Sequence, residues 1–353
     1  MTTDEEVVPV VRPGPVDSPV GSPVEVLLDQ PPSPVPTTPS VQSRALAQLM
    51  MNGVRPIGDR LRITRNPALP VVREAFDAVC WTPVPRGTRF RSVTDSIEGQ
   101  DVSGVWITGR RADESAGVLL YLHGGGFVFG SRKTHRHFVA ALSAATGRPA
   151  FLVDYRRAPE HPFPAAADDA LAAYRWLLAA GYQPGQIVVA GDSAGGHLTA
   201  GLLADLARRR LPMPAAAVLF SPFLDLTCAE LDDRDAVRRD PFVPPQRARE
   251  CGQSYAGEHA LDSRRLDVLR APKRRWPPLL IQVGDTECLL GDSERMAESM
   301  RAAGTHCELQ VWPGQVHVFP AFYPVLPEGR AAIRYVGDFL RATTAAPAAA
   351  WSA

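Results

Sequence analysis

Short apolar runs alternate with alanine-rich segments through the middle of this 353-residue chain, and this alternation limits its fold more than any other feature. The runs are VLLYL (118–122), AFLVD (150–154), QIVVAG (186–191), AAVLFS (216–221) and PLLIQVG (278–284). The alanine-rich segments span roughly 135–146, 165–180, 194–210, 291–304 and 328–342. Buried strands that alternate with helices form βαβ units, in which the strands are parallel and the helices cover both faces. The sequence therefore predicts an α/β fold with a mostly parallel sheet.

The segments before and between these runs extend the prediction to a second structural part. Two stretches near 88–94 and 103–108 alternate polar with apolar residues and are expected to form an antiparallel edge. Residues 41–85 carry amphipathic pieces, and residues 222–275 are rich in Arg, Asp and Pro; both are too long for ordinary connections. We expect N-terminal cap helices in the first and a cap insertion over the substrate in the second, with a catalytic domain over 86–342.

The two ends of the chain lack the patterns of folded elements. Residues 1–40 contain ten prolines and are expected to form a disordered or extended tail, and residues 343–353 a flexible one. The start, MTTDEEVV, lacks the basic-then-apolar pattern of a signal peptide, so a cytoplasmic location is expected. No run of 18 apolar residues exists, so no integral membrane association is expected.

Charge and cysteine content exclude several classes of function. Lys plus Arg and Asp plus Glu are each 38, and this balance gives no support to a nucleic-acid partner. The sequence contains no G-x-G-x-x-G, P-loop or H-E-x-x-H motif, so no cofactor and no metal are expected. The cysteines are odd in number and widely spaced, which predicts free thiols. They are Cys80, Cys228, Cys251, Cys288 and Cys307.

The run at 186–191 leads directly into the sequence G-x-S-x-G, and a helical pattern follows at once. The motif consists of Gly191, Asp192, Ser193, Ala194 and Gly195. A strand, a sharp turn and a helix are the context of a nucleophile elbow, which exposes a serine above the sheet at a helix N-terminus. The positions two before and two after this serine must be small, and both are glycine. A helix start with a capping serine is the alternative, but the context favours Ser193 as a nucleophile.

Three consecutive glycines follow His123 at the end of another apolar run. Glycine loses more backbone entropy on folding than other residues, so a bare main chain here calls for a reason. A serine that attacks a carbonyl creates an oxyanion, which backbone N–H groups stabilise. Ala194 supplies one such donor in an elbow. Gly125 and Gly126 are the candidates for the others, with His123 and Gly124 supporting the loop; an ordinary glycine-rich turn is the alternative.

A nucleophilic serine needs a histidine base, which follows the serine in proteins with such an elbow. Three histidines lie well beyond Ser193: His259, His306 and His317. His259 falls in the cap insertion and His306 opens a strand-like run, CELQVW. His317 follows that run on a loop before the last helix, from which a base can reach over the sheet edge. The pattern favours His317, with a structural histidine as the alternative.

The base in turn needs a carboxylate that orients it, and this should follow the run at 278–284. The candidates are Asp285, Glu287 and Asp292. Asp292 is interpreted as the N-cap of the next helix. Asp285 immediately follows the strand and is expected to hydrogen-bond its own loop. The residues alone do not separate Asp285 from Glu287.

At this point the chain resembles the hormone-sensitive-lipase-like esterases of the α/β-hydrolase superfamily, the bacterial family IV. The matching segments are HGGGF (123–127), DYRRAPEHPFPAA (154–166), GDSAGG (191–196), ECLLGD (287–292) and VWPGQVHVFPAF (311–322). The resemblance covers about residues 80–342. It implies an α/β-hydrolase fold with an eight-stranded sheet and a helical cap, hydrolysis of short- and medium-chain acyl esters, and no cofactor.

The resemblance also implies roles for individual residues. Ser193 would be the nucleophile, His317 the base, and Gly125, Gly126 and Ala194 the oxyanion donors. The usual acid loop of this family reads Asp-Pro-Leu-x-Asp. When it is laid on ECLLGD, the catalytic aspartate falls on Glu287, and Asp285 stays the alternative acid.

Other functions are compatible with the same residues. An amidase, an acyltransferase or a deacetylase would use the same triad. A non-catalytic ligand-binding homologue is a further alternative, because fold alone does not establish activity. The expected partner is a small-molecule ester, and the chain is expected to be a monomer or a homodimer.

Overall fold

The computed structural model describes residues 35–63, 67–80 and 82–345. Most of the predicted N-terminal tail and of the predicted C-terminal tail lies outside these residues. Residues 35–40, the end of the first, lead into helix α1 (Val41–Leu49). There the Ser40 N–H donates to Glu328 Oε1 at 2.6 Å, and the Ser40 hydroxyl caps the helix. Ser40 therefore ties the start of α1 to the C-terminal helix of the sheet domain.

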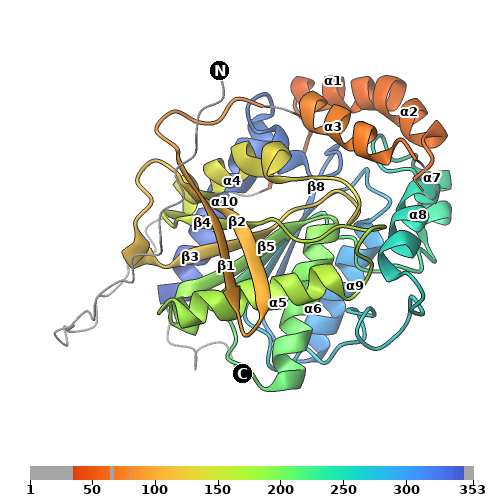
Figure 1. Cartoon of the computed structure of the whole chain (residues 1–353). Helices are drawn as coiled ribbons and strands as arrows, with labels where there is room; N and C mark the ends of the chain where they lie inside the picture. The colour runs from red at the N-terminus through yellow and green to blue at the C-terminus, as the bar shows by residue number, and fades with distance from the viewer. Residues whose placement is uncertain (1–34, 64–66, 81, 346–353) are drawn as a thin grey trace.

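The described residues form one eight-stranded sheet, as expected (Figure 1). The strands are β1 (Arg89–Ile97), β2 (Gln100–Thr108), β3 (Val118–Leu122), β4 (Ala150–Val153), β5 (Ile187–Asp192), β6 (Ala216–Phe220), β7 (Leu279–Gly284) and β8 (Cys307–Trp312). Their order in the sheet is β1-β2-β4-β3-β5-β6-β7-β8. β2 pairs antiparallel with both β1 and β4, and the strands from β4 to β8 are parallel. The mostly parallel sheet with an antiparallel edge is confirmed.

Helices cover both faces of the sheet (Figure 1). They are α4 (Arg132–Thr146), α5 (Ala165–Ala179), α6 (Ala194–Arg209), α9 (Leu290–Ala302) and α10 (Pro327–Ala345). One buried apolar cluster joins the sheet to α4 and α10, and another joins it to α5, α6 and α9. Every residue of β3, β5, β6 and β7 is buried, because both faces of these strands are covered. This is why their sequences are continuous apolar runs.

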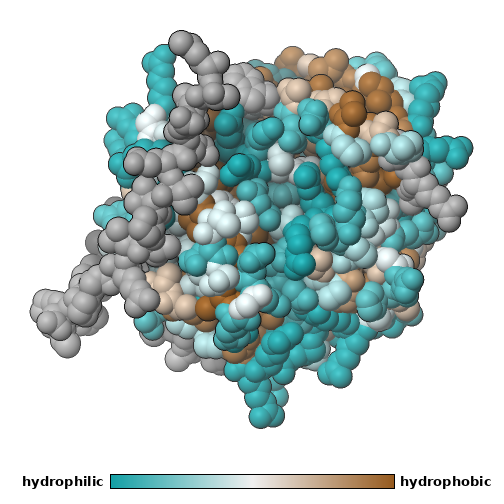
Figure 2. All heavy atoms as spheres, in the orientation of Figure 1, coloured by the Kyte–Doolittle hydropathy of each residue, from teal (hydrophilic) through white to brown (hydrophobic). Residues whose placement is uncertain are grey.

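Two groups of helices lie beyond the sheet and form the parts predicted as a cap (Figure 1). The N-terminal group is α1, a π-helical turn (Met50–Val54), α2 (Arg55–Arg60) and α3 (Leu69–Val79). The second group, α7 (Leu231–Val237) and α8 (Pro245–Ala256), lies within the long connection between β6 and β7. Figure 2 shows apolar surface gathered over the N-terminal group. The exposed apolar side chains of this group are Val41, Leu49, Val54, Ile57, Val71 and Val79.

The expectation that Asp292 caps a helix is wrong. Helix α9 begins at Leu290, and the N-cap position is Leu289. Asp292 lies in the first turn, where its Oδ2 accepts the N–H groups of Leu224 (2.7 Å) and Asp225 (2.9 Å). A tertiary contact with the segment after β6 therefore replaces the local capping contact that the sequence suggested.

The prediction of free thiols is confirmed, because none of the five cysteines forms a disulfide. In the described part of the chain, the helices are all too short or too polar to cross a membrane.

Candidate active site

Ser193 lies at the junction between β5 and α6, in a main-chain conformation that side chains rarely adopt. Its φ is 52° and its ψ is −118°, and its N–H donates to the carbonyl of Phe220 at 2.9 Å. A Cβ on Gly191 would collide with the carbonyl of Gly195. A Cβ on Gly195 would collide with the carbonyl of Leu122 at the end of β3. Only glycine at both positions lets the turn close, and the strained backbone at the serine is typical of a functional elbow.

The loop after β3 presents backbone N–H groups that have no partner. Gly125 and Gly126 have φ values of 111° and 61°, which favour glycine. The carbonyl of Gly125 accepts the N–H of Phe129 at 2.7 Å, so the loop closes on itself. Within the described residues, the N–H groups of Gly125, Gly126 and Ala194 donate to no other group. Buried or half-buried backbone donors are rarely left unpaired in folded proteins, so these three are available to a ligand.

His123 and Gly124 hold this loop from behind. The Nδ1–H of His123 donates to the carbonyl of Gly124 at 2.8 Å, and Tyr155 donates its hydroxyl to the carbonyl of His123 at 2.7 Å. Burial lowers the pKa of His123 to about 3, so its ring is neutral. The N–H of Gly124 donates to Asp192 Oδ1 at 3.0 Å, and Tyr121 donates to the same oxygen at 2.7 Å. Asp192, next to Ser193, thus fixes the elbow to the glycine loop.

Glu287 and His317 form a buried acid–base pair. Nδ1 of His317 lies 2.7 Å from Oε2 of Glu287, and both side chains are almost fully buried. The other carboxylate oxygen accepts the Gly284 N–H at 2.6 Å and the Ser221 hydroxyl at 2.7 Å. Burial lowers the pKa of His317, but the contact with Glu287 outweighs it and raises the pKa above its usual value. The carboxylate therefore fixes the ring orientation and the Nδ1–H tautomer.

Asp285 points away from this pair. Its Oδ1 accepts the N–H of Gly314 at 2.6 Å, and its Oδ2 pairs with Arg238 at 2.9 Å. The expectation that Asp285 bonds its own loop is wrong, because Gly314 belongs to the loop after β8. The geometry favours Glu287 over Asp285 as the partner of His317.

Ser193 and His317 are connected through a residue that sequence reasoning missed. In the described residues, no hydrogen bond joins the Ser193 hydroxyl to His317. The backbone N–H of Ser193 donates to the carbonyl of Phe220, and the next residue, Ser221, accepts the Val318 N–H at 3.0 Å on its hydroxyl oxygen. Ser221 is fully buried and also donates to the carboxylate of the acid–base pair. The available signal was a polar residue at the end of the apolar run next to the elbow strand.

Helix α8 packs directly on the glycine loop, which no local pattern predicted. The ring of Tyr255 stacks on Phe127, with centroids 3.9 Å apart and an angle of 5°. A Cβ on Gly126 would lie 2.5 Å from the sulfur of Cys251. The predicted cap insertion therefore contacts the candidate oxyanion donors themselves.

The comparisons with known proteins identify the family. A family model described as the alpha/beta hydrolase fold matches residues 119–321. An acetyl-hydrolase from Streptomyces hygroscopicus is 42% identical over 68% of this chain and 79% of its own length. A carboxylesterase/phospholipase, LipF, from Mycobacterium tuberculosis is 34% identical over 92% of this chain and 86% of its own length.

Solved structures that resemble this chain are esterases as well. The esterase EstE5, in a crystal soaked with p-nitrophenyl butyrate, has a TM-score of 0.77 and 34% identity over 87% of this chain and all of its own. An esterase from the bacterial hormone-sensitive lipase family matches with a TM-score of 0.77 and 34% identity, over 86% of this chain and 99% of its own.

Proposed function

Since the chain belongs to the hormone-sensitive-lipase group of the α/β-hydrolase family and is a carboxylesterase, we propose that it hydrolyses esters through Ser193, His317 and Glu287. The single observation that carries this proposal is the 2.7 Å contact between Glu287 and Nδ1 of His317. It leaves Nε2 of the ring as the nitrogen that accepts a proton. Ser193 directly follows β5, which is parallel to its neighbour β6, so the serine lies at the edge of the sheet where both strands end.

In the proposed mechanism, Nε2 of His317 takes the proton from the Ser193 hydroxyl as its oxygen attacks the ester carbonyl. The resulting oxyanion accepts hydrogen bonds from the N–H groups of Gly125, Gly126 and Ala194; the loss of one such donor costs roughly 3–4 kcal/mol in a serine protease. The histidine then protonates the alcohol as it leaves, and an acyl-enzyme forms.

Water completes the cycle. His317 removes a proton from water, and the hydroxide attacks the acyl carbonyl. Collapse of the second tetrahedral intermediate releases the acid, and the proton on His317 returns to the serine oxygen. Glu287 stays ionised and stabilises the imidazolium that forms in each half-reaction.

The proposed substrates are esters of short- and medium-chain acids, covered by a cap made of residues 41–85 and 222–275. Helix α8 of this cap lies next to Gly126 through Cys251, so the cap insertion borders the proposed donors. Relatives named as an acetyl-hydrolase and a structure soaked with a butyrate ester support this size class.

Replacing Ser193 with Ala should abolish ester hydrolysis without unfolding the protein, because the mutation removes only the attacking oxygen. A fluorophosphonate should label the wild-type protein once, at Ser193, and leave the variant unlabelled. Turnover of p-nitrophenyl butyrate, intact-mass spectrometry and thermal melting measure these outcomes. Wild-type turnover in Ser193→Ala would refute the proposed function.

Replacing Glu287 with Gln should lower kcat far more than replacing Asp285 with Asn. An amide in place of the orienting carboxylate costs about ten-thousandfold in the serine proteases, because the histidine loses its tautomer and its countercharge. Within the described residues, the Asp285 side chain contacts Gly314 and Arg238 and not His317, so its amide variant is the matched control. Both variants should be compared by kcat and by melting temperature. The opposite ranking would shift the acid to Asp285.

The rate should fall in acid solution, because His317 accepts a proton only when its ring is neutral. Burial opposes the charged ring, but Glu287 raises the pKa above the usual value of 6.5. We therefore expect kcat/KM to decrease as the pH falls through the pKa of His317, which lies above about 6.5. A pH profile on a soluble butyrate ester measures this limb. A limb well below pH 6 would show that the ion pair does not raise the pKa.

The rate should be highest on acyl chains of roughly two to eight carbons, because the chain resembles esterases of this size class and its cap is too short for a large lipase lid. A series of p-nitrophenyl esters from two to sixteen carbons, with a p-nitroanilide as the amide control, measures the preference. Faster turnover of long-chain triglyceride emulsions, or of the anilide, would contradict the proposed substrate class.

A further inference from the structure

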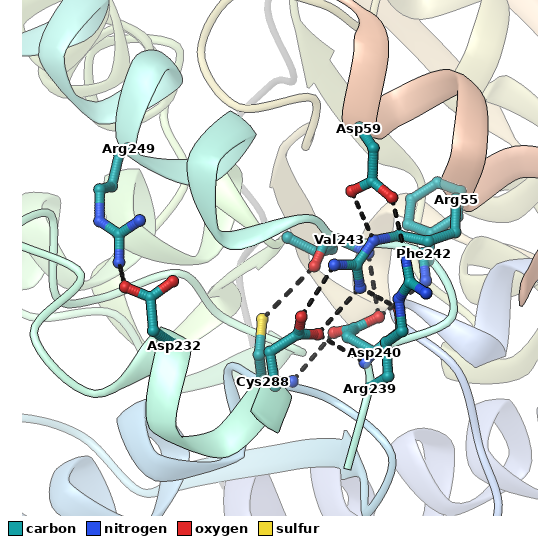
Figure 3. Close-up of polar contacts among 10 residues, drawn as sticks. Arg55, Asp59, Asp232, Arg239, Asp240, Phe242, Val243, Arg249 and Cys288 are labelled. Carbon is teal, nitrogen blue, oxygen red and sulfur yellow. Dashed lines mark hydrogen bonds and ion pairs between the residues drawn. The ribbon is translucent and has the colours of Figure 1, made fainter. Parts of the chain in front are cut away.

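Asp240 is a fully buried carboxylate in the segment between α7 and α8. Its Oδ1 accepts the N–H groups of Phe242 (2.8 Å) and Val243 (2.9 Å). Its Oδ2 reaches into the sheet domain and accepts the N–H of Cys288 at 2.9 Å (Figure 3). Cys288 directly follows Glu287, so this bond fixes the peptide plane on the C-terminal side of the proposed acid. A carboxylate of the cap insertion thus holds the loop that carries Glu287.

The same residue is joined to the N-terminal cap helices. Arg55, which begins α2 and is 4% exposed, donates to the Asp240 carbonyl at 2.6 Å. Arg55 also binds both carboxylate oxygens of Asp235 at 2.8 Å. It binds one carboxylate oxygen of Asp59 at 2.9 Å (Figure 3). The Asp240 N–H donates to Asp235 Oδ1 at 2.8 Å. A buried guanidinium requires such partners, so Arg55 and Asp240 have to pack together.

Asp240 also acts on the base. Phe242, whose N–H it binds, stacks its ring on His317, with centroids 5.8 Å apart and an angle of 24°. The negative charge of Asp240 adds to that of Glu287 in raising the pKa of His317, against the effect of burial. Asp240 therefore fixes a neighbour of each member of the pair: Cys288 beside Glu287, and Phe242 against His317.

From these contacts we propose that Asp240 is a positioning residue for the Glu287–His317 pair, and that Arg55 couples the N-terminal cap helices to this pair through it. The inference rests on the proposed function, because it assigns Asp240 a role only if Glu287 is the acid. The two carboxyl oxygens of Asp240 accept three backbone N–H groups. An asparagine of the same shape has one acceptor oxygen and places an N–H₂ group against one of the three donors.

The test is the substitution Asp240→Asn, compared with Asp232→Asn as the matched control. Asp232 lies in the same cap insertion and pairs with Arg249 of α8, away from the acid loop (Figure 3). We expect Asp240→Asn to lower kcat at least tenfold with little change in KM, measured per fluorophosphonate-labelled serine. Asp232→Asn should keep both constants.

The pH profile provides a readout that a purely structural role would not move. The charged groups that face His317 are Glu287, Asp240 and Asp192. Loss of the negative charge of Asp240 lowers the pKa of His317, so the acid limb of kcat/KM should move to lower pH. If Asp240→Asn keeps the wild-type kcat per labelled serine and the wild-type limb, and only melts earlier, the residue is merely structural and the proposal is overturned.

Arg55→Gln keeps the inference testable if Asp240→Asn does not fold. This variant leaves the Asp240 carboxylate in place but removes the guanidinium that binds the Asp240 carbonyl and Asp235. We expect kcat to fall roughly threefold to tenfold. An unchanged kcat in Arg55→Gln would overturn the coupling. A separate result would show that the proposed function is wrong: the single substitution Glu287→Gln would then retain activity.

Discussion

The main-chain contact between the end of β3 and the first turn of α6 determines where the rest of the site lies. No side chain fits at Gly195, because a Cβ would collide with the carbonyls of Leu122 and His123. The loop that carries Gly125 and Gly126 leaves β3 at that point, so the serine and the unpaired donors have a fixed separation. The bond from Gly124 to Asp192 strengthens the same contact. A packed main chain changes position less readily than a side chain does, so this part of the site is formed before any substrate binds.

The acid–base pair depends on a different physical constraint, the high free energy of a buried charge. Glu287 is almost fully buried, and a carboxylate in that position is stable only with hydrogen-bond donors around it. Gly284, Ser221 and His317 supply those donors, from the end of β7, the end of β6 and the loop after β8. Since three chain segments converge on one carboxylate, the pair also holds together the sheet edge on which it lies.

The sequence predicted the sheet, its flanking helices and the elbow, because these follow from local periodicity and glycine spacing. The bounds of β3 agree with its apolar run and those of β8 with the strand-like run CELQVW, and the helices begin and end within a few residues of the expected positions. Local rules failed where a tertiary contact competes with them, as at Asp292, which binds the segment after β6 rather than its own helix end. Ser221 stood out only as a polar residue at the end of an apolar run, and no local pattern encodes its bond to Glu287 or the bond of Asp240 to Cys288, because these partners lie 66 and 48 positions away. Family resemblance, not periodicity, favoured Glu287 over Asp285 as the acid, and Glu287 is the carboxylate that contacts His317.

The stacking of Tyr255 on Phe127 joins helix α8 to the glycine loop, which has consequences for selection among substrates of different size. In many enzymes the residues that limit substrate size are separate from the groups that stabilise the oxyanion, and an oversized substrate simply binds weakly. Under the proposed mechanism, a substrate that pushed α8 outward would also displace Phe127 and, through the adjoining peptide, Gly126. Steric misfit would then reach a proposed oxyanion donor, and discrimination between large and small substrates would be expressed in the rate of bond cleavage more than in the affinity of binding.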